Sequence, residues 1–338
     1  MKWLVALCLV LSIFALACSD GAGKDEPAPT VTVTALYPIP PGFTLGVGYG
    51  HQGSDAFVVT ADGLERIVSS PWNDGGATWS PDCSRFAFTS NRPPGGSGNH
   101  NIWIMSADGT DPVSLMDSPQ TEQGPEWSPD GTRIAFTRSE LDTAKGPQPP
   151  NGWIPPKSTE IYVINADGTG ERRLTDGPGL KGISSWSPDG ELMLLNVAQQ
   201  DTESGFQIAE TFEIYVMSAD GTDMRNLSNN PGKDNSATWS PDGELIVFES
   251  TRGNGKSDIY VMNADGSNVR RLTDHPEHDM LPNWSPDGNW ISFTSFRQER
   301  EGTLSDIADI YLMKADGSDV QHVVRGWGSG WSTCTAQP

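Results

Sequence analysis

Cysteine is scarce in this chain, which has four among 338 residues. Two of them, Cys8 and Cys18, lie in the apolar N-terminal stretch, which leaves Cys83 and Cys334 for the rest of the chain. No pair has the Cys-x-x-Cys spacing that binds zinc. The sequence therefore excludes a zinc site of that type.

Positive charge is also scarce, with 22 Lys and Arg against 44 Asp and Glu, a formal net charge of −22. This imbalance argues against nucleic acid and anionic lipid surfaces as partners. The sequence also lacks a phosphate loop, a dinucleotide fingerprint and the Gly-x-Ser-x-Gly elbow of serine hydrolases. Acidity alone is equally expected of a soluble exported protein, so it does not identify a ligand.

Only one long apolar run is present, at residues 3–16, and Lys2 precedes it. It is too short for a membrane span and predicts an export signal over residues 1–18. Residues 14–19 resemble the lipobox of bacterial lipoproteins, and this resemblance implies lipid attachment at Cys18. Ordinary cleavage near Ala17 is the alternative. Contact with the membrane is expected only through this anchor.

Residues 19–42 are rich in Pro, Thr, Gly and charge and show no helical or strand period. This composition predicts an extended tether. The globular part should then occupy residues 43–338.

A Trp-Ser-Pro-Asp-Gly stretch dominates the remainder of the chain. Its tryptophans are Trp79, Trp127, Trp186, Trp239 and Trp284, with a broken copy at Trp331. An Ala-Asp-Gly stretch alternates with it, for example at Asp265 and Asp316. Self-similarity with a period of about fifty residues indicates stacked supersecondary units.

Each repeat contains four short runs rich in β-branched and aromatic residues, too short for helices. Ser-Pro-Asp-Gly favours a tight turn, and Asp-Gly between apolar runs is a strong hairpin signal. We therefore expect an all-β fold, a six-bladed β-propeller of four-stranded antiparallel blades. The motif tryptophans should pack in its core.

The two ends of the chain should close the ring within one blade. Residues 328–332 would supply its inner strand, and residues 43–49, 56–60 and 64–68 the other three. Cys83 and Cys334 each follow an inner-strand motif, and these two strands would then lie in neighbouring blades. We predict a disulfide between them, formed in an oxidising compartment.

Strand alternation predicts two faces. The turn face carries the Ser-Pro-Asp-Gly and Ala-Asp-Gly turns; the loop face carries the longer, variable connections, with Trp72 and His100. Variable loops on a rigid scaffold are where binding usually resides.

Three arginines occur thirteen residues after their motif Trp, and a polar residue opens the next strand of each repeat. We expect cross-strand pairs at the hairpin mouths. The arginines are Arg92, Arg252 and Arg297, and the expected partners are Asn101, Asp258 and Asp309.

Charged residues stand five positions before five of the motif tryptophans. They are Asp74, Glu122, Lys181, Asp234 and Asp279. They should enter the innermost strands and ring the axial opening, where four carboxylates could bind a cation such as Ca²⁺. The alternative is that each carboxylate caps its own turn.

The repeat, which also includes runs such as Ile134–Thr137 and Arg270–Thr273, resembles the propeller repeat of the TolB family over about residues 43–334. TolB is a periplasmic component of the Tol-Pal system with an α/β domain before its propeller; here only the tether precedes it. The resemblance implies a monomeric, non-enzymatic binding or scaffold protein outside the cytoplasmic membrane, with an envelope protein or glycan as partner and no required cofactor.

The alternative is a metal-dependent enzyme. Oligogalacturonate lyases resemble this repeat class and carry a His-bound manganese. His275 and His278 form the one histidine cluster in the sequence. A solvated polar loop is the simpler interpretation of that cluster.

Overall fold

The computed structural model describes residues 44–49, 55–60, 63–68, 72, 74–93, 99–141, 156–198, 212–253, 255–297 and 308–332. The predicted export signal with Cys18, the predicted tether and Cys334 lie outside these ranges. Within the described ranges, no helix has the length and apolar character required to span a membrane.

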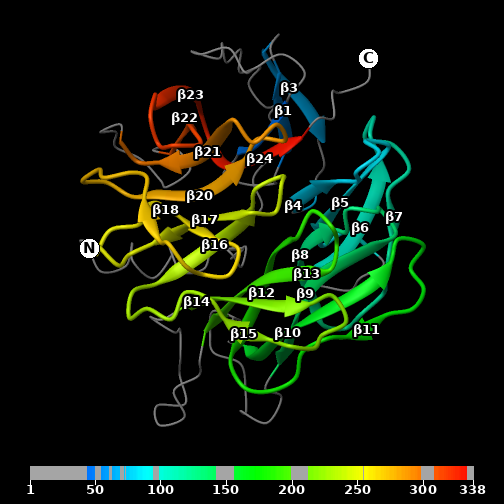
Figure 1. The fold of residues 1–338 in the computed structure, drawn as a ribbon. Coiled ribbons are helices and arrows are strands. Elements are labelled where there is room, and N and C mark those ends of the chain that lie inside the picture. The colour runs from blue at the N-terminus through cyan, green and yellow to red at the C-terminus, as the bar shows by residue number, and fades with distance from the viewer. Residues whose placement is uncertain are drawn as a thin grey trace, which may run out of the picture.

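Twenty of the strands form five continuous blades, each a four-stranded antiparallel sheet made by four consecutive strands (Figure 1). The first two blades are β4 (Asp74–Trp79), β5 (Arg85–Ser90), β6 (Asn101–Ser106) and β7 (Val113–Ser114), then β8 (Thr121–Trp127), β9 (Arg133–Leu141), β10 (Pro156–Asn165) and β11 (Arg172–Arg173). The third is β12 (Leu180–Trp186), β13 (Leu192–Ala198), β14 (Phe212–Ser218) and β15 (Arg225–Asn226). The last two are β16 (Asp234–Trp239), β17 (Leu245–Ser250), β18 (Asp258–Asn263) and β19 (Arg270–Arg271), then β20 (Asp279–Trp284), β21 (Trp290–Ser295), β22 (Asp309–Lys314) and β23 (Gln321–Arg325).

The expected count of six blades needs correction, because the complete repeat unit occurs as five blades. The remaining sheet has the order β24-β1-β2-β3 and is a composite of both ends of the chain. Its first two strands are not consecutive, so no Ser-Pro-Asp-Gly turn can join them. Six motif tryptophans therefore overstate the number of continuous blades by one.

Pairing of the terminal strands, in contrast, is confirmed. β24 (Trp327–Ser332) pairs antiparallel with β1 (Thr44–Tyr49), which continues into β2 (Asp55–Thr60) and β3 (Gly63–Val68). β24 also contacts β20 and β21, and β2 contacts β4. The composite sheet thus lies between the first and the last continuous blades.

Both faces of each blade are buried, because alternate residues of a strand face opposite neighbours. In β17, Ile246 and Phe248 pack in one apolar cluster, whereas Val247 packs in the next one. This explains why the second strand of each repeat is almost continuously apolar rather than alternating.

In four of the continuous blades, the motif tryptophan of the inner strand packs against the preceding blade. Trp284 of β20 shares a cluster with Val247, Ile259 and Val261 of the blade before it, and its side chain is 8% exposed. Trp127, Trp186 and Trp239 are equally buried in clusters that span two blades. The packing role that we expected for these four tryptophans is confirmed.

The turns follow the chemistry of their sequence. In the last continuous blade, Gly288 donates its N–H to the Ser285 carbonyl at 2.9 Å, and the Ser285 hydroxyl donates to Asp287 at 2.6 Å. Gly288 has a φ of 70°, a conformation that glycine adopts without strain. Cys83 occupies the matching position of the first continuous blade with a φ of 62°.

We predict that Trp284→Ala lowers the free energy of unfolding by about 3–5 kcal/mol, because it leaves a cavity between two blades. Urea denaturation measures the change. Trp72→Ala is the matched control: this tryptophan is 39% exposed, and we expect a loss of less than about 1 kcal/mol. Equal losses in the two variants would contradict the packing role.

Cys83 is disulfide-bonded. Because the other three cysteines lie outside the described residues, its pairing with Cys334 stays a prediction. Such a bond would tie the first continuous blade to the composite sheet.

We predict that Cys83→Gly has opposite effects in oxidised and reduced protein. Without reductant, the variant loses the cross-link and should be less stable by about 4 kcal/mol. With reductant, it should be more stable than wild type by about 1 kcal/mol, because glycine accepts the left-handed backbone. Urea denaturation under both conditions measures this. Two free thiols in denatured, unreduced protein would contradict the pairing itself.

Candidate functional site

All five charged residues predicted at the axial opening are buried at the loop-face ends of the inner strands. Asp74, Asp234 and Asp279 begin β4, β16 and β20, and Glu122 and Lys181 are the second residues of β8 and β12. Removing a charge from water costs several kcal/mol, so each of these groups requires a partner.

The four carboxylates each pair with an arginine from the same blade, near the end of the second strand. The N–O distances are 2.6 Å for Arg92–Asp74, 2.8 Å for Arg138–Glu122, 2.8 Å for Arg252–Asp234 and 2.7 Å for Arg297–Asp279. These ion pairs neutralise the buried carboxylates within single blades.

Aromatic rings hold the arginines in place. The guanidinium carbon of Arg252 lies 5.0 Å from the centre of the Phe248 ring and 5.3 Å from that of Tyr260. Arg92, Arg138 and Arg297 make the same pair of contacts in their blades. Each arginine thus satisfies a carboxylate and covers apolar rings at once.

Burial raises the pKa of Asp234 and of Glu122, and the hydrogen bonds and charge of their partners offset part of this increase. Loss of hydration is the larger effect at both residues. The carboxylates therefore depend on their arginines to remain ionised in the folded protein.

The predicted partners of Arg92, Arg252 and Arg297 were wrong. These arginines pair with the first residue of the inner strand, while the acid of the third strand is paired with an outer-strand cation. Arg271 lies 2.5 Å from Asp258, and the His322 ring lies 3.0 Å from Asp309. The reason is register: Asp234, Ser250 and Asp258 form one row across three strands, with a cation reaching it from each side.

In the third continuous blade, the charged position near the start of the inner strand is positive instead of negative. Lys181 stands where the other blades have a carboxylate, and its ammonium lies 3.2 Å from Glu160 of the preceding blade. The Gly177 carbonyl accepts a further hydrogen bond from it at 3.0 Å. The ion pair here joins two blades rather than lying within one.

The predicted cation-binding group of Asp74, Glu122, Asp234 and Asp279 is not assembled. Among the described residues, no three Asp, Glu, His or Cys side chains are grouped as a metal site would need. The alternative of backbone capping does not account for the pairing either, since each of the four carboxylates forms an ion pair with an arginine.

The two histidines of the predicted cluster, His275 and His278, accept hydrogen bonds from backbone N–H groups. Nδ1 of His275 accepts the N–H of Glu277, and Nδ1 of His278 accepts the N–H of Ser257, both at 3.1 Å. Burial lowers the pKa of His278. His275 therefore helps to shape the loop between β19 and β20, and His278 connects that loop to the residue before β18.

Besides these ion pairs, a set of hydrogen bonds that the sequence analysis did not predict joins neighbouring blades. In the second to fifth continuous blades, the residue ten positions after the motif Trp accepts a hydrogen bond from the backbone N–H of the next inner strand. These interblade latches are Thr137 to Ile183 (3.3 Å), Asn196 to Ser236 (3.2 Å), Glu249 to Leu281 (3.0 Å) and Thr294 to Gly328 (3.2 Å).

The latches satisfy backbone groups that the sheet leaves unpaired. The inner strands are bulged at these points, and Ser236 and Leu281 have φ values of 54° and 53°. A bulge removes N–H groups from the ladder, so they need another acceptor. Thr89, Thr137 and Thr294 repeat at this position and were the available sequence signal, although the Thr89 hydroxyl donates instead to the Gly75 carbonyl of its own blade.

One latch is a carboxylate. Burial raises the pKa of Glu249 from 4.5 to about 7, although the Leu281 N–H and Lys233 partly oppose this. Burial also raises the pKa of Glu126, on inner strand β8, to about 8. Both side chains are therefore partly or mostly protonated near neutral pH.

Comparison with known families supports the architecture. A family profile described as the Tricorn protease N-terminal beta propeller domain matches residues 206–328. An uncharacterized peptidase, YuxL of Bacillus subtilis, is 27% identical over 125 residues, which are 36% of this chain and 16% of that protein. The chain thus matches a small part of this curated relative.

Solved structures of TolB proteins have the same fold. A putative TolB from Agrobacterium tumefaciens has a TM-score of 0.62 and 22% identity, with 84% of this chain and 91% of that chain covered. TolB from Acinetobacter baumannii has a TM-score of 0.62 and 17% identity, covering 85% of this chain and 64% of that one. The chain has a TolB-like β-propeller fold.

An oligogalacturonate lyase in complex with manganese is also similar, with a lower TM-score of 0.56 and 13% identity over 87% of this chain and 85% of that chain. At these identities the likeness concerns the fold alone.

We predict that Arg252→Met lowers the free energy of unfolding by about 3–5 kcal/mol, because it leaves the Asp234 carboxylate buried without a counter-ion. The double variant Asp234→Asn/Arg252→Met removes both charges and should recover most of the loss. Urea denaturation measures both. A double variant as unstable as the single one would show that the lone charge is not the cause.

We predict that Glu249 makes the protein less stable as pH rises. The folded protein binds the Glu249 proton more tightly than the unfolded chain, so this contribution is full below about pH 4.5 and is lost as pH passes about 7. Glu249→Gln should reduce this slope in plots of unfolding free energy against pH, and the part that Glu126 contributes should remain. Glu244→Gln, at an exposed carboxylate, is the control and should leave the slope unchanged.

Proposed function

We propose that this protein is a non-enzymatic binding or scaffold protein of the cell envelope, whose rigid propeller presents the loop face to a protein or glycan. The observation that carries the proposal is the internal pairing of the inner-strand charges. Asp74, Asp234 and Asp279 each form an ion pair with an arginine of their own blade. Such pairing supports a fixed platform, with the variable loops around it as the contact region.

The site of action is proposed to be outside the cytoplasmic membrane. The TolB-like fold and the apolar stretch at residues 3–16 support export, and the lipobox resemblance supports an anchor at Cys18. Metabolic labelling with a fatty acid, compared between wild type and Cys18→Ser, tests the anchor. Equal labelling of both proteins would contradict it.

Site-directed photo-cross-linking in cells tests the binding face. A cross-linking amino acid replaces Trp72 on the loop face or Val320 on the turn face, and each of these side chains is 39% exposed. We expect defined adducts with an envelope component from position 72 and none from position 320. Adducts from position 320 alone, or from neither position, would contradict the loop face as the contact region.

The metal-dependent lyase is the second candidate function, supported by the likeness to the manganese-bound oligogalacturonate lyase. Elemental analysis of the purified protein and an assay of oligogalacturonate cleavage test it. Stoichiometric manganese together with cleavage would favour the lyase over the binding protein.

A further inference from the structure

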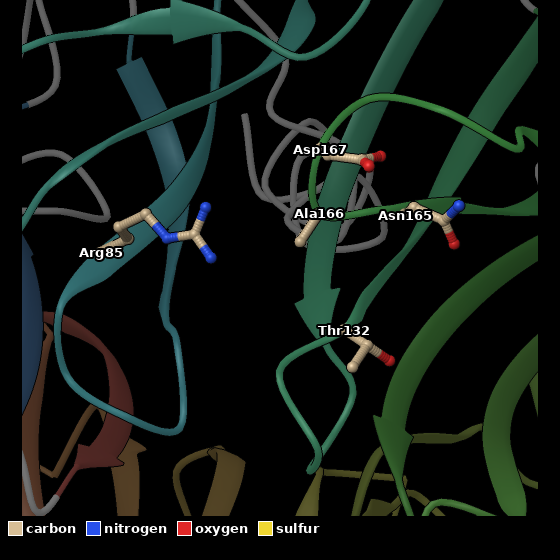
Figure 2. A pocket seen from close by; sticks show the side chains of 5 residues that line it. All are labelled: Arg85, Thr132, Asn165, Ala166 and Asp167. Atoms are coloured by element: carbon tan, nitrogen blue, oxygen red, sulfur yellow. The ribbon is translucent and has the colours of Figure 1, made fainter.

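A cavity opens on the turn face, between the first two continuous blades. It has a volume of about 370 Å³ and is lined by Arg85, Thr132, Asn165, Ala166 and Asp167 (Figure 2). Figure 2 shows the Arg85 side chain extending into the gap toward Ala166 and Thr132, while the side chains of Asn165 and Asp167 point away from it.

A second hollow, of about 320 Å³, shares Arg85 with the first. Its other lining residues are Ser80, Pro81, Asp82, Asp130 and Gly131, all from Ser-Pro-Asp turns. Arg85 therefore stands where two hollows meet.

Among the described residues, no carboxylate lies within ion-pair distance of the Arg85 guanidinium, although the charges of Arg85 and Asp82 attract each other at longer range. Its carbon lies 5.1 Å from the centre of the Trp127 ring, and within the described ranges its guanidinium makes neither an ion pair nor a hydrogen bond. The partly buried arginines of the loop face, such as Arg252, are in contrast each paired with a carboxylate. A partly buried guanidinium with free donors favours a carboxylate ligand.

The carboxylates around the hollows are committed to their own turns. Asp82 accepts the Ser80 hydroxyl at 2.6 Å and the Ser84 N–H at 3.1 Å. Asp130 accepts the corresponding groups of its turn, and Asp167 accepts from Thr169. These bonds keep all three carboxylates ionised, so the rim is negative and the centre positive.

A positive centre surrounded by negative groups favours a ligand that has a negative group between positive ones. A simple anion would be repelled by the three rim carboxylates, and a simple cation by Arg85. A peptide with one acidic side chain between basic ones satisfies both. We propose that the Arg85 cavity binds a polypeptide segment of a partner protein, which places one carboxylate on Arg85 and basic side chains near Asp82, Asp130 and Asp167.

The repeat itself indicates that Arg85 is not needed for folding. The residue six positions after the motif Trp is Leu192 in the third continuous blade and Leu245 in the fourth. Arg133 holds this position in the second blade, where its guanidinium carbon lies 5.0 Å from the centre of the Trp186 ring. Arg85→Leu and Arg133→Leu are therefore matched substitutions of arginines on tryptophan rings.

The test measures binding of two blocked peptides, Lys-Lys-Glu-Lys-Lys and Lys-Lys-Gln-Lys-Lys, by calorimetry at low salt. Wild type should bind the glutamate peptide about five-fold more tightly than the glutamine peptide, the magnitude expected of one partly exposed ion pair. Arg85→Leu should bind both equally, and Arg133→Leu should retain the preference.

Three outcomes would overturn the proposal: no binding of either peptide by wild type, no preference in wild type, or an unchanged preference in Arg85→Leu. Melting curves of the variants confirm that they are folded. This cavity lies on the face opposite the variable loops. A negative result in the peptide test would therefore leave the proposed function of the loop face unaffected. A negative result in the cross-linking test would likewise leave the proposal for the Arg85 cavity unaffected.

Discussion

Packing of four motif tryptophans against the preceding blade is the interaction on which the rest of the structure depends. Trp284 joins Val247, Ile259 and Val261 of its neighbour in one apolar cluster, and the same arrangement recurs along the chain. Since the four clusters that contain Trp127, Trp186, Trp239 and Trp284 each span two blades, these blades do not bury their apolar faces alone. Stability is therefore shared between neighbours, and the two ends of the chain must meet to cover the terminal faces.

Charge is organised differently on the two faces. On the loop face, buried carboxylates are neutralised by arginines that lie on aromatic rings, so the charges stabilise the scaffold. On the turn face, acids such as Asp82 and Asp130 remain exposed or nearly so, bound only to their own turns. The excess negative charge of the protein is therefore most accessible to a partner on the turn face. There, Arg85 places one positive charge among the carboxylates.

The bulged inner strands need hydrogen-bond acceptors from the preceding blade, and one of these acceptors is a group that titrates. A bulge frees N–H groups from the sheet, and a side chain of the preceding blade accepts them. Threonine and asparagine do this without a charge, whereas Glu249 carries a group whose pKa is raised to about 7 by burial. One position of an otherwise neutral ring of contacts therefore responds to proton concentration in the physiological range.

The sequence by itself determined the strands, both types of turn, the packing of the tryptophans and the pairing of the two ends. These features follow from local turn chemistry and from a repeated apolar pattern. Only the tertiary structure decided which acid meets Arg252, which residues form the interblade latches, how many blades are continuous, and that Arg85 faces a cavity. Ion pairs and latches depend on strand register and on the neighbouring blade, which bring together residues that no local pattern relates.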